Sequence, residues 1–190
     1  FVALPEVGRP QINDLDKDGR RKFLAAINAL DRSDWRYVTG MLAYYSGMRA
    51  SEICALKWRD INLNRKTIQV SKASSTVKDE RGRNIAEVNP RTKTNAGYRT
   101  IYFPSQLKEA LLEYLGGRSP KANDNVLDER HRNPSNMCGS FLSWSRANGI
   151  VGRMGKPITI HCLRHTYATM QVQMGTDIKT LSSQLGHARA

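Results

Sequence analysis

The sequence predicts one domain of the α+β class, mostly helical, with a small antiparallel β-sheet on one flank. Three observations lead to this prediction. The chain has 190 residues, which suffices for one well-packed domain. Apolar residues recur at helical spacing over most of its length. Two short segments in the middle instead alternate between apolar and polar residues, as half-buried strands do.

The first elements along the chain are expected to be a linker and then helices. Residues 1–15 contain two prolines, a glycine and few periodic apolar residues, which indicates the end of an interdomain linker. Residues 16–30 carry apolar side chains at helical spacing, and Ser33 is expected to cap a second helix that Gly47 ends. A short third helix follows, so Arg49 lies at a junction between two helices.

The middle of the chain changes to an extended pattern. Residues 67–70 alternate as a strand, and residues 98–103 do so again after a turn signal at 94–97. The segment between the two strands is rich in Lys and Arg. We expect these strands to pair in the small sheet, with a long basic excursion between them.

The remainder of the chain again predicts helices. Residues 105–115 have helical spacing, and residues 134–148 form a helix that opens with a proline. A polar loop is expected between these two. The last two helices, at 159–174 and 177–185, are separated by Gly175.

The charge of the chain is positive and unevenly distributed. The formal net charge is +13, of which residues 64–103 carry +6 and residues 136–190 carry +5. Two concentrated basic blocks suit a face that binds a polyanion such as nucleic acid. A solvated basic loop beside ordinary surface helices would account for the same distribution.

Composition also limits the compartment. The mean hydropathy is −0.55, no apolar run approaches 18 residues, and the start has no secretion signal, so no membrane partner is expected. The cysteines, Cys54, Cys138 and Cys162, show no paired spacing, which indicates a reducing compartment and neither a disulfide framework nor a zinc site. The chain starts at Phe1 and is expected to be a piece of a longer protein.

One helical segment carries side chains suited to a phosphate. His161 and Arg164 lie one turn apart, so an imidazole and a guanidinium can converge on one small anion. Arginine stays charged and binds two phosphate oxygens at once, whereas histidine exchanges a proton near neutral pH. Taken alone, this spacing also fits an ordinary surface pair.

Four linked boxes resemble those of the tyrosine recombinase (phage integrase) family. Residues 46–61 match the first box, T/S-G-x-R-x-x-E-(I/L)-x-x-L-x-W-x-D-(I/V), nearly throughout. The second box, H-x-L-R-H-(T/S)-x-A-T, matches residues 161–169, and the third begins L-G-H at residues 185–187. The lysine hairpin, T-K-(T/N)-x-x-x-x-R-x-(I/V), matches residues 92–101. Order and separations agree, so the resemblance covers about residues 15–190.

The resemblance implies a catalytic set and a supporting residue. The catalytic residues would be Arg49, Lys93, His161, Arg164 and His187, with Glu52 holding the site in place. The two arginines would neutralise the phosphate oxygens, and Lys93 would protonate the departing 5′ oxygen. His161 would accept or position a proton, and His187 would donate to the phosphate. For Arg49 with Glu52, the alternative is a plain surface ion pair.

The same match suggests DNA contacts on and around the lysine hairpin. The expected DNA-binding residues are Lys72, Lys78, Arg91 and Arg99. Because these residues share one basic region with Lys93, any of them could reach the DNA. The resemblance implies neither a metal ion nor a cofactor.

The implied function is site-specific DNA recombination. The complete protein would integrate and excise a phage or conjugative element through a covalent 3′-phosphotyrosine intermediate. The family's nucleophile lies about nine residues beyond the L-G-H histidine, which is past Ala190. Residues 16–190 are therefore expected to be a catalytic domain that stops before its tyrosine and is inactive alone. None of the tyrosines present is a convincing substitute.

The resemblance also implies partners and a location. Double-stranded DNA is the expected partner, with four full-length protomers on DNA and a monomeric fragment in solution. The expected location is the bacterial cytoplasm, at the nucleoid when DNA is bound. Alternatives are a chromosome-dimer resolvase of the same chemistry, a type IB topoisomerase, or a non-catalytic DNA-binding relative. The intact catalytic set argues against the last.

Overall fold

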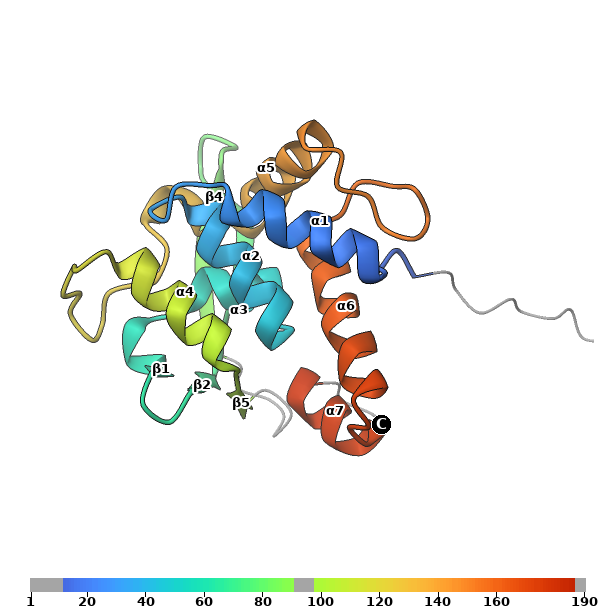
Figure 1. Ribbon diagram of the computed structural model, residues 1–190. Helices are drawn as coiled ribbons and strands as arrows, with labels where there is room; N and C mark the ends of the chain where they lie inside the picture. Colours follow the sequence, from blue (N-terminus) through green and yellow to red (C-terminus); the bar gives the residue numbers. More distant parts are fainter. Residues whose placement is uncertain (1–11, 91–97, 187–190) are drawn as a thin grey trace, which may run out of the picture.

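The structure is a computed structural model that describes residues 12–90 and 98–186. Helices make up about half of it, around two small antiparallel sheets (Figure 1), so the predicted α+β class is confirmed. The helices are α1 (Lys17–Asn28), α2 (Trp35–Ser46), α3 (Ala50–Ala55), α4 (Ser105–Leu115), α5 (Pro134–Ala147), α6 (Ile160–Gln173) and α7 (Ile178–Leu185), with 3₁₀ helices η1 (Trp58–Asp60) and η3 (Glu129–His131). The strands are β1 (Ile61–Asn62), β2 (Thr67–Val70), β3 (Lys72–Lys78), β4 (Asn84–Pro90) and β5 (Arg99–Tyr102).

The expected pairing of two strands is present, and a third strand joins them. Strand β2 lies between β1 and β5, antiparallel to both. Ile68 is opposite Ile101 in the ladder, and both side chains are fully buried. Successive side chains on a strand point to opposite faces of the sheet, so this pair marks the face that packs on the core.

The basic excursion is itself a β-hairpin, which the sequence analysis missed. Strands β3 and β4 pair antiparallel in a sheet of their own, with Gly82 at φ 74° in the turn between them. The hairpin rests on α3 and α5, where Thr76 Oγ1 donates to Asn133 Oδ1 at 3.1 Å. Its residues lack strong apolar alternation, because the hairpin leans on the domain only along one edge.

Side-chain oxygens cap the starts of α1, α2, α5, α6 and α7. Asp16 Oδ1 accepts from Gly19 N at the start of α1, and Asp177 Oδ1 accepts from Thr180 N at the start of α7. The prediction that Ser33 caps α2 was wrong. Asp34 occupies that position and accepts from the Arg36 amide at 2.8 Å, while Ser33 bonds backwards to an aspartate.

Helix α2 is the centre of the domain. It packs against α1, α3, α4 and α6, and its residues are buried over almost the whole length. Fully buried side chains from α1, α2, α5 and the sheet form one core, including Phe23, Leu42, Ile68 and Phe141. A second, small cluster of Tyr167, Leu181 and Leu185 attaches α7 to α6. In Figure 1, α7 therefore lies at the far end of α6, next to β5.

The residues just before α1 are docked against the rest of the domain. Asp14 and Leu15 are buried; the Leu15 amide donates to Thr166 Oγ1 at 2.9 Å, and Asp14 accepts from Thr169 at 2.9 Å. The packed domain therefore includes residues that the sequence analysis assigned to the linker, while residues 1–11 lie outside the described part. No helix in the described ranges has the length and apolar content needed to cross a membrane.

Candidate active site

Arg49 is placed by the sharp turn between α2 and α3. Gly47 ends α2 in the left-handed region at φ 63°, and Arg49 starts α3 from an extended conformation. The Glu52 carboxylate reaches back to this start. Its Oε2 accepts from the Arg49 amide at 2.9 Å and its Oε1 from Arg49 Nη1 at 3.0 Å. Spacing of three residues makes this closed loop possible.

Glu52 has a second and stronger partner in Arg99. The two guanidinium nitrogens Nη1 and Nη2 of Arg99 donate to the two carboxylate oxygens at 3.0 and 2.7 Å. The Glu52 side chain is 0% exposed and that of Arg99 is 5% exposed. Burial alone would raise the pKa of Glu52, but the hydrogen bonds and charge of Arg99 and Arg49 lower it below its ordinary value. Glu52 is thus a buried anion.

Arg164 is buried on α6 and faces the same turn. Its Nη1 donates to the Gly47 carbonyl and its Nη2 to the Leu185 carbonyl, both at 2.7 Å. The backbone carbonyl of the turn and that of the end of α7 are therefore joined through one planar group. Arg164 thus connects two residues that lie 117 and 21 positions away from it in the sequence.

The end of α7 is held by arginines. Arg49 Nη1 and Nη2 donate to the carbonyls of Leu185 and Gly186, each at 3.1 Å, and Arg99 Nε donates to the Gln184 carbonyl at 2.6 Å. The last carbonyls of a helix have no partner within the helix, and its C-terminal end is partially negative. We call the side chains that serve this end the arginine cluster: Arg49, Arg99 and Arg164.

The arginine cluster carries three positive charges against the single carboxylate of Glu52. Arg99 and Arg164 are buried, whereas the side chain of Arg49 is 30% exposed. Within the described part of the chain, Arg49 Nε has no hydrogen-bond partner. The excess positive charge and this open donor suit an anion that approaches from solvent.

His161 lies beside the cluster on the exposed side of α6. Its Nε2 is 2.8 Å from His165 Nε2, and the two rings meet edge to face. Burial, followed by the charges of Arg164 and Arg49, lowers the pKa of His161 below 6.5. The imidazole is therefore neutral at pH 7 and able to accept a proton.

The other predicted site residues are placed as follows. Lys93, Arg91 and His187 lie outside the described residues. Lys72 and Lys78 lie at the two ends of β3, and Lys78 is exposed. Arg99 differs from the expectation that it contacts DNA: its guanidinium is enclosed by the protein and bonded to Glu52 and to α7.

The seven tyrosines in the described ranges differ in exposure. Tyr37, Tyr44, Tyr114 and Tyr167 are buried and Tyr45 is partly buried, and burial raises the pKa of each, that of Tyr44 to about 12. Tyr98 and Tyr102, by contrast, are exposed. A raised pKa makes a phenol a poorer nucleophile at neutral pH, so the buried group is unsuited to attack a phosphate.

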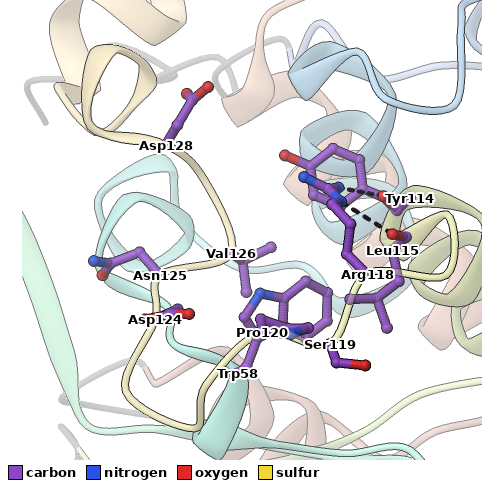
Figure 2. A pocket seen from close by; sticks show the side chains of 10 residues that line it. All are labelled: Trp58, Tyr114, Leu115, Arg118, Ser119, Pro120, Asp124, Asn125, Val126 and Asp128. Carbon is purple, nitrogen blue, oxygen red and sulfur yellow. Dashed lines mark hydrogen bonds between the residues drawn. The ribbon is translucent and has the colours of Figure 1, made fainter.

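Two negative observations concern the same ranges. Among residues 12–90 and 98–186, no three His, Cys, Asp or Glu side chains gather closely enough to hold a metal ion. The cavity of about 320 Å³ in Figure 2, lined among others by Trp58, Tyr114 and Arg118, contains none of the predicted site residues.

The fold is that of tyrosine recombinase catalytic domains. It is similar to a crystal structure of XerA recombinase, with a TM-score of 0.67 and 25% identity over 95% of this chain and 58% of that one. It is also similar in fold to the Tn1549 transposon integrase solved in complex with transposon right end DNA, with a TM-score of 0.73 and 19% identity over 98% of this chain and 61% of that one.

Sequence comparison gives the family. Residues 13–190 match the phage integrase family, and the chain belongs to it. It is 30% identical over 161 residues to a tyrosine recombinase XerC-like protein of Caldanaerobacter subterraneus subsp. tengcongensis, covering 78% of this chain and 41% of that protein. It is 26% identical to tyrosine recombinase XerA of Thermococcus kodakarensis, covering 97% and 57%. The chain thus spans about half the length of these relatives.

Sequence reasoning identified Arg49, Glu52, His161 and Arg164, which the structure brings together. It missed that Arg49 and Arg164 donate hydrogen bonds to the carbonyls at the end of α7. A signal was present: a glycine directly after the last periodic residue predicts a helix end with exposed carbonyls. That arginines from three distant segments would bind them depends on tertiary contacts.

Proposed function

We propose that the chain is the catalytic domain of a site-specific DNA recombinase that breaks and rejoins strands through a covalent 3′-phosphotyrosine intermediate. The observation that carries this proposal is the convergence of Arg49 and Arg164 beside a neutral His161. Such an array suits a phosphodiester, because two guanidiniums can neutralise the charge that develops on the non-bridging oxygens without a metal ion.

Each side chain has a role in this proposal. Arg49, with an open donor, meets the phosphate first, and Arg164 holds the turn behind it. His161 accepts the proton of the attacking tyrosine. Lys93 protonates the departing 5′ oxygen and His187 donates to the phosphate, on the strength of the sequence boxes alone.

The proposal places the nucleophile beyond Ala190. Support comes from the tyrosines that the structure describes, of which four are buried with raised pKa values. It also comes from the greater length of the relatives. In this view a linker from a preceding domain ends ahead of the buried Asp14 and Leu15, the catalytic domain runs from there to residue 190, and this stretch alone is inactive.

The proposed substrate is double-stranded DNA, with four full-length protomers assembling on it. Similar folds have been solved on DNA: the Tn1549 transposon integrase with transposon right end DNA, and the XerH site-specific recombinase bound to difH substrate. A net charge of +13 suits the same partner. A bacterial cytoplasmic location follows from this role.

The experiment is covalent trapping. The full-length protein is incubated with nicked suicide duplexes carrying its candidate site and is analysed on a denaturing gel beside Arg164→Ala. Arg118→Ala is the matched control, since Arg118 also donates to carbonyls at a helix end, away from the arginine cluster. An adduct from the wild type and the control, but not from Arg164→Ala, supports the proposal.

The DNA used decides between the two recombinase roles. Cleavage of an attachment site of a phage or conjugative element supports integration and excision, the role we favour. The sequence relatives named XerA and XerD make a chromosome-dimer resolution site the second substrate to offer. Salt-sensitive binding of a confirmed site without any adduct would favour a non-catalytic DNA-binding protein.

A further inference from the structure

We propose that Arg99 is a positioning residue of this site, which joins strand β5 both to the buried Glu52 carboxylate on α3 and to the end of α7. The inference rests on the proposed function. It assigns Arg99 a place behind the reacting groups and no contact with DNA.

The contacts of Arg99 leave its guanidinium fully engaged in two directions. Nη1 and Nη2 grip both oxygens of Glu52, and Nε donates to the Gln184 carbonyl at 2.6 Å. The side chain is 5% exposed. A phosphate approaching from solvent would have to displace a buried, bidentate ion pair, which is among the costliest contacts to break.

The position of Arg99 in the chain gives these contacts a purpose. Arg99 begins β5, directly after the segment that carries Lys93. Glu52 holds Arg49 on α3, and Gln184 lies three residues before His187 at the end of α7. One planar group therefore joins β5, α3 and α7, and each of these elements adjoins a proposed catalytic residue in the sequence.

Helix α7 needs such an anchor. It has eight residues, and its buried apolar side chains are Leu181 and Leu185, packed mainly on Tyr167. An isolated helix of this length is unstable in water, so its orientation depends on tertiary contacts. Without Arg99, the Gln184 carbonyl loses its donor and Glu52 retains Arg49, whose approach to a phosphate then changes.

Arginine is required by this geometry. One planar guanidinium donates the two bonds to Glu52 and the bond to Gln184 at fixed angles. A lysine, with a single nitrogen, cannot reproduce this arrangement. Arg99→Lys keeps the buried positive charge and removes the fork, while Arg99→Gln removes both. The two variants therefore separate loss of charge from loss of geometry.

The test measures strand cleavage and DNA binding separately in the full-length protein. With saturating suicide duplex, we expect adduct formation to slow about 100-fold in Arg99→Lys and at least as much in Arg99→Gln, as expected when reacting groups shift by about 1 Å. The slope of log K against log salt stays at the wild-type value. If Arg99 contacted a phosphate, Arg99→Gln, which removes the charge, would instead lower the magnitude of that slope by about 1.

Amide hydrogen exchange supplies a readout that does not depend on activity. We expect exchange in α7 to be at least about tenfold faster in Arg99→Lys than in the wild type, because a local contact that orders the helix is lost. Arg118→Gln is the matched control. It removes an arginine that donates to the Leu115 and Tyr114 carbonyls at the end of α4 (Figure 2). We expect it to leave both the rate of adduct formation and the amide exchange in α7 unchanged.

The outcomes are distinguishable. Wild-type cleavage and wild-type α7 exchange in a folded Arg99→Lys overturn the positioning role, as does a reduced salt slope in Arg99→Gln. If Arg99→Gln fails to fold, Arg99→Lys alone decides. If the wild type itself forms no adduct, the proposed function fails, and the exchange data still show whether Arg99 anchors α7.

Discussion

The position of Gly47 imposes two requirements that only glycine meets. It ends α2 at φ 63°, and a Cβ placed there would lie 2.5 Å from Cδ1 of Tyr167. Gly47→Ala is expected to lower the free energy of unfolding by about 3 kcal/mol, from about 1 kcal/mol of left-handed strain and the remainder from overpacking. Urea unfolding followed by circular dichroism measures this loss.

Gly175 is the matched control for that substitution. It has φ 84°, and a Cβ there would meet nothing within 4 Å. Gly175→Ala is therefore expected to cost only the strain of about 1 kcal/mol. Equal losses in the two variants would show that the approach of Tyr167 to Gly47 contributes nothing.

Glu52 is the single buried carboxylate between Arg49 and Arg99. Glu52→Gln keeps the shape and removes the charge, which leaves two guanidiniums without their counter-ion; we expect a loss of about 3 kcal/mol at pH 7. Because the pKa of Glu52 is lowered from 4.5 in the folded state, this stabilisation is present above pH 4.5 and is lost as pH falls through the folded value.

Unfolding of wild type and Glu52→Gln across a pH series checks both statements. The gap between the two proteins should be widest near neutral pH and should close in acid. A gap that stays constant down to strongly acidic pH would mean that the charge of Glu52 is not what stabilises the fold.

His161 gives the site a second pH dependence. Its pKa lies below 6.5 in the folded protein, so the neutral form persists to lower pH than in a free histidine. As pH falls below 6.5, the unfolded state takes up this proton more readily, and stability decreases. We expect the rate of adduct formation to fall in acid with a midpoint below pH 6.5. A midpoint above pH 6.5 would contradict a neutral proton acceptor.

At the scale of elements, the hairpin of β3 and β4 is the feature that the sequence analysis did not find. It places Lys72 and Lys78 at the two ends of β3, and both remain proposed DNA contacts. Lys72→Gln with Lys78→Gln is expected to reduce the magnitude of the salt slope of DNA binding by about 2, one for each lost phosphate contact. Strand cleavage at saturating DNA should change little.

Titrations of a fluorescent duplex at several salt concentrations measure that slope. Lys121→Gln, which removes an exposed lysine from a different loop, is the control for net charge. If the double variant and the control have the same slope, the hairpin does not follow the DNA backbone.

Most helices were predicted well because residue types at their ends give local signals. The start of α7 at Asp177, its end at Gly186 and the end of α2 at Gly47 all follow from residue types that cap helices. The hairpin has no comparable signal. Its strands are paired with each other along seven residues and rest on α3 and α5 without an apolar face of their own.

At the scale of the whole molecule, the net positive charge leads to one further prediction. The 190-residue chain is expected to sediment as a monomer without DNA and to bind duplex DNA weakly, with affinity that falls steeply as salt rises. Sedimentation velocity and a binding series from low to high salt measure these properties. A stable oligomer without DNA, or affinity indifferent to salt, would contradict the expectation.

The sequence by itself determined the helical class and the family boxes, and it singled out Arg49, Glu52, His161 and Arg164 as candidate site residues, because caps, periodicity and short spacings are local properties. The tertiary structure alone decided where the side chain of Arg99 lies and what it contacts. In the sequence it is one basic residue of a basic segment, and only packing shows it buried between Glu52 and α7. Burial removes an arginine from solvent and commits it to a fixed partner, and burial is set by contacts between residues far apart in the chain.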